Sequence, residues 1–455
     1  MFKDRAYYRN MLTIAVPIII QQFIASALNM IDVVMIGQLG DVNVASVSLA
    51  NQFGFILFFV LFGVSSGSAA FTAQYWGKND VPSIHKVVGI GLSLGLATAV
   101  VFTVVALTAP GVIMRIYSND PQVVANGSGF LRIVALSYVA TALTFVFAAA
   151  LRSTGNTRLP MFTSVLAISL KTAFSFLLIF GNLGLPEMGI RGAALATVIA
   201  RAIECAVLLF LIYKLRTPVA ARLSTMFAFS REFVGRFLKT SLPVVFNESL
   251  WSLGVTTYNA IYARIGTDAV AAVNIASTFE NLGFVLFIGI SEAGGILIGN
   301  KIGAGDTETA RVYGRRSLIL GVSGAVVVGL ILVASTGLLP VLYKLSPVAI
   351  ANAKSLMTIM GLTLWTRVAN MTTVVGVLRP GGDTRFGLIL EGGSMWLVGV
   401  PTALLGAFVF HLPIYWVYLM IVSEELVRLG FGLWRFRSGK WIHNLTQPAA
   451  IVAEA

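Results

Sequence analysis

The chain has 455 residues, of which 57% are hydrophobic and only 11% are charged, whereas a soluble domain typically has about 25% charged residues. This composition predicts a membrane protein, and the lack of any long hydrophilic block in the sequence leaves no room for a soluble catalytic domain. The formal net charge of +13 comes from residues in the connections between apolar runs, so we expect no nucleic-acid partner.

Apolar runs long enough to cross about 30 Å of hydrocarbon recur along the whole chain. The first, from Met11 to about Ile36, is too long for a signal peptide and has no small-residue cleavage site. Polar breaks, glycines and prolines divide the chain into twelve predicted helices. They start near residues 10, 45, 87, 123, 159, 191, 240, 270, 314, 349, 386 and 411.

The distribution of basic residues predicts the orientation of these helices. With both termini on one side, that side holds 22 Lys and Arg residues, and the opposite side holds four: Arg115, Arg191, Arg264 and Lys344. The positive-inside rule therefore places both termini in the cytoplasm. Anionic lipid at the inner surface is the expected partner of the basic connections.

The sequence also contains an internal repeat. A shift of 226 residues lays the segment from Val16 over the segment from Leu242 without a gap, and "LRSTGNTRLP" at 151–160 resembles "LRPGGDTRFG" at 378–387. Because an even number of spans separates the copies, they form a parallel repeat, for which a substrate site near the membrane midplane between two lobes is expected. We predict an N-terminal lobe (1–215), a cytoplasmic linker (216–239), a C-terminal lobe (240–440) and a cytoplasmic tail (441–455).

The paired LR and TR loops follow predicted helices 4 and 10 on the cytoplasmic side. Gly155 and Gly382 supply turn chemistry there. Their arginines can cap helix C-termini and bind lipid phosphate, so we interpret the loops as structural hinges or caps rather than substrate contacts.

Several motifs occur together in this repeat. Pro17 and Asp32 lie in helix 1, "GQLG" ends that helix, "LIFG" closes helix 5 and "GAALAT" opens helix 6. With the repeat length and the LR and TR loops, this combination resembles the multidrug and toxic compound extrusion (MATE) family. The resemblance implies an all-α membrane protein with twelve transmembrane helices in two six-helix pseudo-symmetric lobes forming a V. It also implies an antiporter, not an enzyme, that exports cationic or amphiphilic compounds in exchange for H+ or Na+.

The first predicted site is in the N-terminal lobe. An ionisable side chain at membrane depth is costly and invites a functional interpretation, and Asp32 matches the helix 1 aspartate that takes part in ion coupling in the family. Lys171 stands where many relatives carry Asn. It can form a fixed ion pair with Asp32, titrate, or instead line a water-filled cavity or pair with another acid. Thr197 is a predicted polar neighbour, so we expect ion coupling to involve Asp32, Lys171 and Thr197, with Asp32 also binding substrate.

The second predicted site is in the C-terminal lobe. Glu248 on helix 7 resembles a glutamate of the NorM branch, although that glutamate falls about one turn later, at Trp251. Predicted helix 10 offers Trp365 and Arg367 and no acid, so a complete NorM-type Na+ cage is not expected. An unpaired guanidinium in lipid is costly, so Arg367 is expected to pair with Glu248, Glu280 or another acid.

We therefore add Glu248 to the ion-coupling residues. The predicted substrate-binding residues are Asp32, Glu248, Trp251, Glu280, Trp365 and Arg367, with the tryptophans supplying cation-π contacts. For Glu391, structural pairing and substrate binding are equally favoured. Glu204 with Arg201, and Glu424 and Glu425 with Arg428, are interpreted as local helix pairs.

Other classes of function lack the motifs they need. No phosphate-binding G-x-x-x-x-G-K-[ST] motif occurs, and no Cys/His cluster has metal-site spacing, so neither a cofactor nor a metal is expected. The single Cys205 excludes an intrachain disulfide. The sequence predicts a secondary active multidrug antiporter of the inner membrane, working as a monomer by alternating access. The alternative is a flippase of a lipid-linked or other amphiphilic substrate, which is expected to line its cavity with several arginines.

Overall fold

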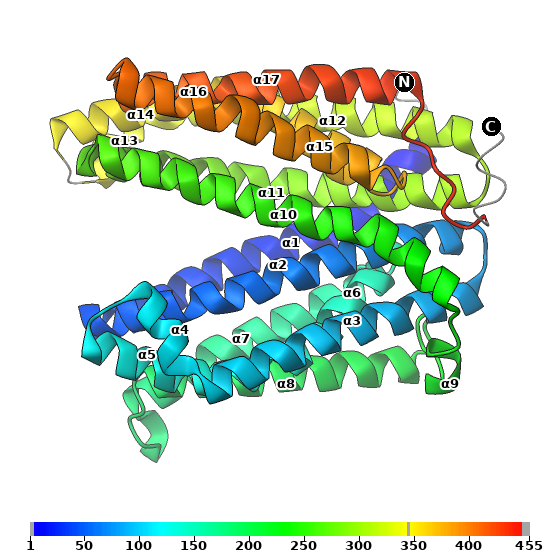
Figure 1. Cartoon of the computed structure of the whole chain (residues 1–455), viewed down its shortest axis with the longest axis horizontal. Coiled ribbons are helices and arrows are strands. Elements are labelled where there is room, and N and C mark those ends of the chain that lie inside the picture. The colour runs from blue at the N-terminus through cyan, green and yellow to red at the C-terminus, as the bar shows by residue number, and fades with distance from the viewer. Residues whose placement is uncertain (1–3, 344–345, 448–455) are drawn as a thin grey trace. The chain divides into compact units, whose positions relative to one another are not determined.

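The computed structural model describes residues 4–343 and 346–447, apart from the side chain of Leu342. Lys344 and residues 448–455 of the predicted tail lie outside the described residues. The described part of the first half forms α1 (Arg5–Gly37), α2 (Asp41–Gly77), α3 (Val81–Thr108), α4 (Pro110–Tyr117), α5 (Pro121–Ala135), α6 (Tyr138–Ser153), α7 (Arg158–Phe180), α8 (Ile190–Lys214) and α9 (Leu223–Met226) (Figure 1).

The second half begins with α10 (Arg231–Ile265), α11 (Thr267–Gly303), α12 (Thr307–Ala334), α13 (Leu339–Leu342) and α14 (Pro347–Thr373). It ends with α15 (Thr384–Ser394), α16 (Val400–Leu404) and α17 (Ile414–Ser438). Three turns of π-helix lie next to these helices. One extends α14 (Val374–Leu378), one joins α15 to α16 (Met395–Gly399), and one extends α16 (Leu405–Val409). Short 3-10 turns cover Asn182–Gly184 and Ser335–Leu338.

The observed helices follow the predicted ones closely. Eleven of the twelve predicted starts fall inside a helix, and the one near 411 precedes α17 by three residues. Among the described residues, nine helices are long and apolar enough to span a membrane, and α5 with α6 forms a further span bent by 49°. At 35 and 25 residues, α10 and α17 are also long enough, since a helix rises about 1.5 Å per residue.

The chain divides into two compact units, and the last boundary between them in the sequence falls between Leu238 and Lys239, at the end of the predicted linker. We call residues 20–72 and 80–238 the N-terminal unit, and the described residues of 1–19, 73–79 and 239–455 the C-terminal unit. The start of α1 belongs to the C-terminal unit because the Tyr7 hydroxyl lies 2.8 Å from that of Ser317. Met11 also packs there with Ala293 and Leu297.

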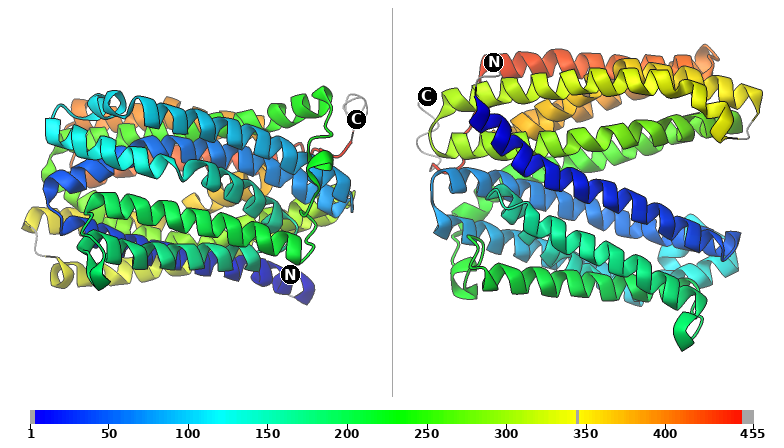
Figure 2. Two further views of the ribbon diagram at one scale, coloured as in Figure 1. Left: turned by 90° about the horizontal axis from the view of Figure 1, so that it is seen from below. Right: turned by 180° about the vertical axis from the view of Figure 1, so that it is seen from behind.

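Each unit has its own apolar core. In the N-terminal unit α7 packs on α8, and α3 on α6. In the C-terminal unit α14 packs on α11, α12 and α17. Figure 2 shows the helices of each unit running side by side. The repeat is visible at one close contact inside the C-terminal unit, where a Cβ on Gly77 would overlap the Asn300 carbonyl and one on Gly303 would overlap the Gln74 carbonyl. These four residues form two pairs related by the 226-residue shift.

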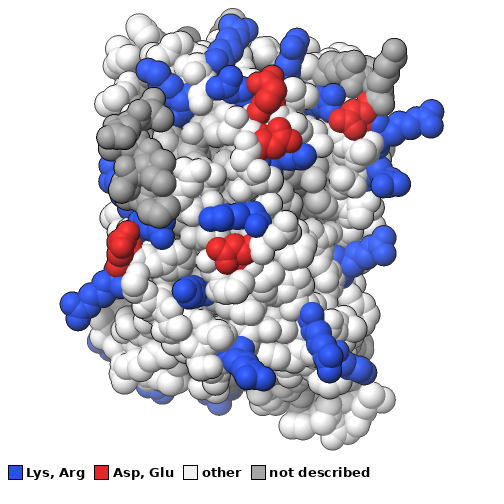
Figure 3. All heavy atoms as spheres, turned by 90° about the vertical axis from the view of Figure 1, so that its right-hand side faces the viewer, with Lys and Arg blue, Asp and Glu red and all other residues white. Residues whose placement is uncertain are grey.

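One end of the molecule carries mainly basic side chains among its charged residues (Figure 3). Figure 3 shows the end of the molecule that lies on the right of Figure 1, and Lys and Arg outnumber Asp and Glu on it. In the C-terminal unit, α1 begins and α17 ends at this side of Figure 1. A basic end of this kind is the feature that the positive-inside rule associates with the cytoplasm.

Candidate ion-coupling and substrate site

Asp32 and Lys171 form an ion pair in the N-terminal unit. Lys171 Nζ on α7 lies 2.6 Å from Asp32 Oδ2 on α1, and the side chains are 28% and 9% exposed. The other carboxylate oxygen, Oδ1, is buried and accepts no hydrogen bond from the described residues. A buried acceptor without a donor is costly. The carboxylate is therefore held by one cation and retains an oxygen that can take a proton or a second cation.

Two cavities meet at Lys171. A cavity of about 120 Å³ is lined by Asp32, Lys171, Thr197 and apolar neighbours such as Ile36 and Val134. A larger one, of about 260 Å³, is also lined by Lys171 and Thr197 but not by Asp32. The structure thus brings the predicted trio together, and Lys171 both pairs with Asp32 and lines a cavity.

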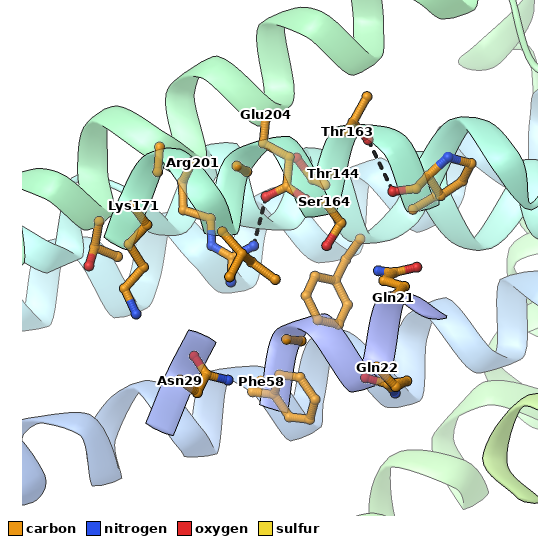
Figure 4. Close-up of a pocket in the computed structure, with 18 of the residues that line it drawn as sticks. Gln21, Gln22, Asn29, Phe58, Thr144, Thr163, Ser164, Lys171, Arg201 and Glu204 are labelled. Atoms are coloured by element: carbon orange, nitrogen blue, oxygen red, sulfur yellow. Dashed lines mark hydrogen bonds and ion pairs between the residues drawn. The ribbon is translucent and has the colours of Figure 1, made fainter. Parts of the chain in front are cut away.

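The larger cavity is polar on both sides. Figure 4 shows Lys171 and Arg201 extending from α7 and α8 toward Gln21 and Asn29 on α1, with Glu204 behind Arg201. Arg201 Nη1 donates a 2.7 Å hydrogen bond to Glu204 Oε2. The predicted Arg201 and Glu204 helix pair therefore forms, but it is also part of a cavity wall.

The C-terminal unit holds a larger cluster of charges. Arg379 Nη2 lies 2.6 Å from Glu248 Oε1 and 3.6 Å from Glu391 Oε2. Arg428 Nη1 lies 3.9 Å from Glu391 Oε1 and 3.8 Å from Glu425 Oε1, and the same guanidinium binds Glu424. We call these residues the carboxylate network: Glu248, Arg379, Glu391, Glu424, Glu425 and Arg428. If all are ionised, four carboxylates surround two guanidiniums and the net charge is −2.

Neutral groups hold these carboxylates in place. Asn247 donates to Glu391, Asn370 Nδ2 donates a 2.6 Å bond to Glu425 Oε2, and the Tyr258 hydroxyl donates to Glu424 Oε2. Gly399, in a π-helical turn, leaves room for this last contact, because a Cβ there would overlap both partners. Such π turns are frequent at functional sites.

Arg367 pairs with Glu280, one of the three partners that the sequence left open. Its Nη1 lies 2.5 Å from Glu280 Oε2, with the guanidinium 31% and the carboxylate 3% exposed. The guanidinium carbon lies 5.2 Å from the centre of the Phe284 ring. This pair between α14 and α11 is separate from the contacts of Glu248, so the predicted second site consists of two groups of residues.

The two predicted tryptophans have different surroundings. Trp251 on α10 is 39% exposed. Trp365 on α14 is partly buried against the apolar core of the C-terminal unit. The substrate contacts of both remain predictions.

The arginine of the second LR loop was not among the predicted site residues. Arg379 is only 6% exposed and binds carboxylates, so the structure does not give it the role of an exposed, lipid-binding cap. Its equivalent Arg152 lines the larger cavity of the N-terminal unit. The repeat could have drawn attention to both arginines, because each copy that carries one also carries an acid or an amide at equivalent positions of other helices.

Within residues 4–343 and 346–447, no three or more His, Cys, Asp and Glu side chains are arranged to hold a metal ion. The carboxylate network has more carboxylates than guanidiniums, so its net negative charge when ionised is not balanced by the basic residues within it.

Comparisons with known proteins agree with this architecture. A family model described as MatE matches residues 17–177 and 243–405, one segment in each repeat. The chain is 26% identical to the probable multidrug resistance protein NorM of Thermotoga maritima over 438 residues, covering 95% of this chain and 93% of that protein. It is 24% identical to the multidrug resistance protein MdtK of Yersinia enterocolitica, with 98% and 97% covered.

Solved structures give the same result for the fold. The outward-facing structure of a multidrug resistance MATE family transporter of the MOP superfamily matches with a TM-score of 0.84 and 20% identity, covering 95% of this chain and 97% of that chain. The predicted all-α, two-lobe membrane fold is therefore confirmed.

Proposed function

Because the chain belongs to the MatE family of transporters, we propose that it is a secondary active multidrug efflux antiporter that exchanges cationic or amphiphilic compounds for H+ or Na+. The names of its relatives support multidrug efflux. The repeated helices favour alternating access, in which two halves expose one site to either side in turn. No soluble cofactor is needed for this cycle.

The observation that carries the coupling proposal is the acid excess of the carboxylate network. Four buried or nearly buried carboxylates share two guanidiniums, and an uncompensated charge at membrane depth costs several kcal/mol. Binding of protons or a cation removes that cost. Among the described residues Glu248 forms its salt bridge with Arg379, and Arg379 is shared with a second acid, Glu391. We therefore assign the coupling role to Glu248.

Asp32 forms the second coupling site in this proposal. Its unbonded Oδ1 accepts the ion, while Lys171 holds Oδ2. Ion binding weakens the interaction of either site with a cationic substrate and favours the return of the carrier, since a ligand shifts a conformational equilibrium only through its different affinity for the two states.

We place the protein in the inner membrane as a monomer with both termini cytoplasmic. The basic end seen in Figure 3 supports this orientation. Anionic lipid headgroups are the partners of that surface.

The test is export of a fluorescent organic cation from vesicles that contain the purified protein, under an imposed pH gradient or an imposed Na+ gradient. Glu248→Gln and Asp32→Asn are compared with wild type. Transport driven by either gradient and lost in at least one variant supports the proposal. Transport that needs neither gradient, or that both variants retain, contradicts the coupling assignment.

A flippase remains the second candidate because basic side chains line the larger cavity: Arg152, Lys171 and Arg201. An anionic headgroup is the ligand that such a wall would suit. A flippase moves its lipid between leaflets of the same vesicles, whereas the proposed antiporter moves a soluble dye across them, so a quenching assay on labelled anionic lipid separates the two.

A further inference from the structure

The repeat places the larger cavity and the carboxylate network at equivalent positions of the two units. The ungapped shift of 226 residues pairs Gln22 with Glu248, and the LR and TR loops, shifted by 227, pair Arg152 with Arg379. The second shift also pairs Ser164 on α7 with Glu391 on α15, upstream of the first π-helical turn of that span. The structure agrees, because Gln22, Arg152 and Ser164 line one cavity.

The charges of the two equivalent places differ. The arginine is kept in both units, but the carboxylates that contact it in the C-terminal unit are replaced by an amide and a hydroxyl in the N-terminal unit. The N-terminal unit therefore has the same scaffold with fewer acids. Glu204 is the one acid among the described residues that line its cavity, and it is already bonded to Arg201.

The ion pairs around this cavity also turn their cations toward it. Lys171 is 28% exposed and its partner Asp32 only 9%. Arg201 is 36% exposed and its partner Glu204 only 3%. In both pairs the carboxylate lies behind the base, and Figure 4 shows both bases directed at the space between α7, α8 and α1. A ligand that enters meets N–H donors first.

Both bases retain donors after pairing. A guanidinium has five N–H donors and an ammonium three, and the hydrogen bond from Arg201 to Glu204 uses one. Gln21 and Gln22 add amide donors on the opposite side. Phe58 and Phe145 supply apolar walls. A cavity that combines N–H donors with aromatic walls suits an amphiphile whose polar end is an acid.

We propose that this cavity binds the acidic group of a zwitterionic amphiphile, with Lys171 and Arg201 as its anchors. The inference rests on the proposed efflux function and specifies its substrate class: compounds that carry a carboxylate beside their cationic group are preferred over the same compounds without it. A charge-assisted hydrogen bond to the acid supplies the preference.

The test compares two dyes that differ only in this group: a rhodamine with a free carboxylate, and its methyl ester. The acid form is zwitterionic and the ester is a cation. Their Kd values for the purified full-length protein are measured by fluorescence polarisation, without any ion gradient. We expect the acid to bind the wild type about tenfold more tightly, the amount expected for one charge-assisted hydrogen bond, and its affinity to fall with salt more steeply than that of the ester.

Two variants locate the preference. The double variant Arg201→Gln with Glu204→Gln removes the ion pair without changing the net charge of the cavity. Its Kd values for the acid and for the ester are expected to lie within about twofold of each other. Gln22→Glu places an acid at the position of Glu248 and is expected to reverse the preference. Gln38→Glu makes the same change at an exposed position outside the cavity and should leave the ratio at its wild-type value.

The outcomes separate this inference from the proposed function. Equal or tighter binding of the ester by the wild type overturns it, as does an acid preference that persists in Gln22→Glu. Failure to bind either dye overturns it as well. Gradient-driven export of the ester alone would leave the efflux function standing without the acid site. Selective binding of the acid without any gradient-driven export would support the site and contradict the efflux function.

Discussion

The carboxylate network makes a prediction about stability that depends on which charge is removed. The wild-type network has four carboxylates and two guanidiniums, a net charge of −2 when ionised. Arg379→Gln leaves four carboxylates and one guanidinium, a net charge of −3. Glu248→Gln leaves three and two, a net charge of −1, and the double substitution restores −2. Stability is therefore expected to fall in the order Glu248→Gln, double variant, Arg379→Gln.

The size of the effect follows from burial. The side chains of Arg379 and Glu248 are 7% and 13% exposed, and Arg379 Nη2 lies 2.6 Å from Glu248 Oε1. Removal of one partner from a buried pair typically costs about 3–5 kcal/mol, because the remaining charge is left without compensation. We expect Arg379→Gln to lose about 3 kcal/mol, which corresponds to a Tm lower by roughly 6–12 °C for a unit of this size. Glu248→Gln is expected to lose less than about 1 kcal/mol, because Arg379 keeps Glu391 at 3.6 Å.

The chain contains suitable reporters for this measurement. All seven tryptophans lie in the C-terminal unit, and the single cysteine, buried Cys205, lies in the N-terminal unit. Thermal unfolding in detergent is followed by tryptophan fluorescence, and labelling of Cys205 by a thiol-reactive dye reports the other unit separately. The reasoning is refuted if Arg379→Gln is as stable as Glu248→Gln, or if adding Glu248→Gln destabilises it further. A lower pH should also reduce the loss in Arg379→Gln, because protonated carboxyls carry no charge.

Three further predictions concern other parts of the molecule. Gly303→Ala puts a Cβ onto the backbone of α2 and should cost about 2 kcal/mol by tryptophan fluorescence, whereas Gly235→Ala has open space and should be neutral or stabilising. Asp306→Ala should lower the free energy of unfolding by roughly 0.5 kcal/mol at pH 7. Because the hydrogen bonds from Thr309 lower the pKa of Asp306, a pH titration should show this loss shrinking only below about pH 4. Lys171→Met leaves the buried carboxylate of Asp32 without its cation and should lower the free energy of unfolding of the N-terminal unit by about 2 kcal/mol. The loss is measured as faster labelling of Cys205, and an unchanged labelling rate would contradict the ion pair.

The fold was predictable from the sequence because membrane spans leave a strong local signal. Apolar length, basic connections and the 226-residue repeat depend on nearby residues or on direct comparison of two segments. The 49° bend between α5 and α6 was not predicted. It falls at Leu136 and Ser137, where neither proline nor glycine marks it. Each of the three π-helical turns contains a glycine, but with 44 glycines in the chain this residue does not distinguish them.

The candidate site was predictable in part. The pairs of Asp32 with Lys171 and of Glu280 with Arg367 were among the alternatives that the sequence left open, because a lone charge at membrane depth requires a partner. The carboxylate network was missed because its members come from helices far apart in the chain. Arg379 and Glu248 are 131 residues apart, and Arg379 belongs to a loop whose turn residues alone explained it.

The local interpretation of the last charged cluster was also incomplete for a physical reason. Arg428 does bind Glu424 one turn away, as a helix pair should. Its guanidinium also reaches Glu391 on α15, a contact that depends on the packing of two helices and not on spacing along one of them. Periodicity identifies the pair, and only tertiary structure shows that it is joined to others.

The two units therefore use one duplicated scaffold for different electrostatic purposes. Both keep the LR arginine, but Gln22 and Ser164 in the N-terminal unit stand where Glu248 and Glu391 stand in the other. In our proposals the acid excess of the carboxylate network favours protons or cations, whereas the bases of the larger cavity, with their buried counterions, favour anionic groups. If one ancestral site served both purposes, ion and substrate would compete directly for the same charges. With the acids that contact the LR arginine confined to one copy, a substrate that carries both a cation and an acid could be bound in the other copy without neutralising the carboxylate network.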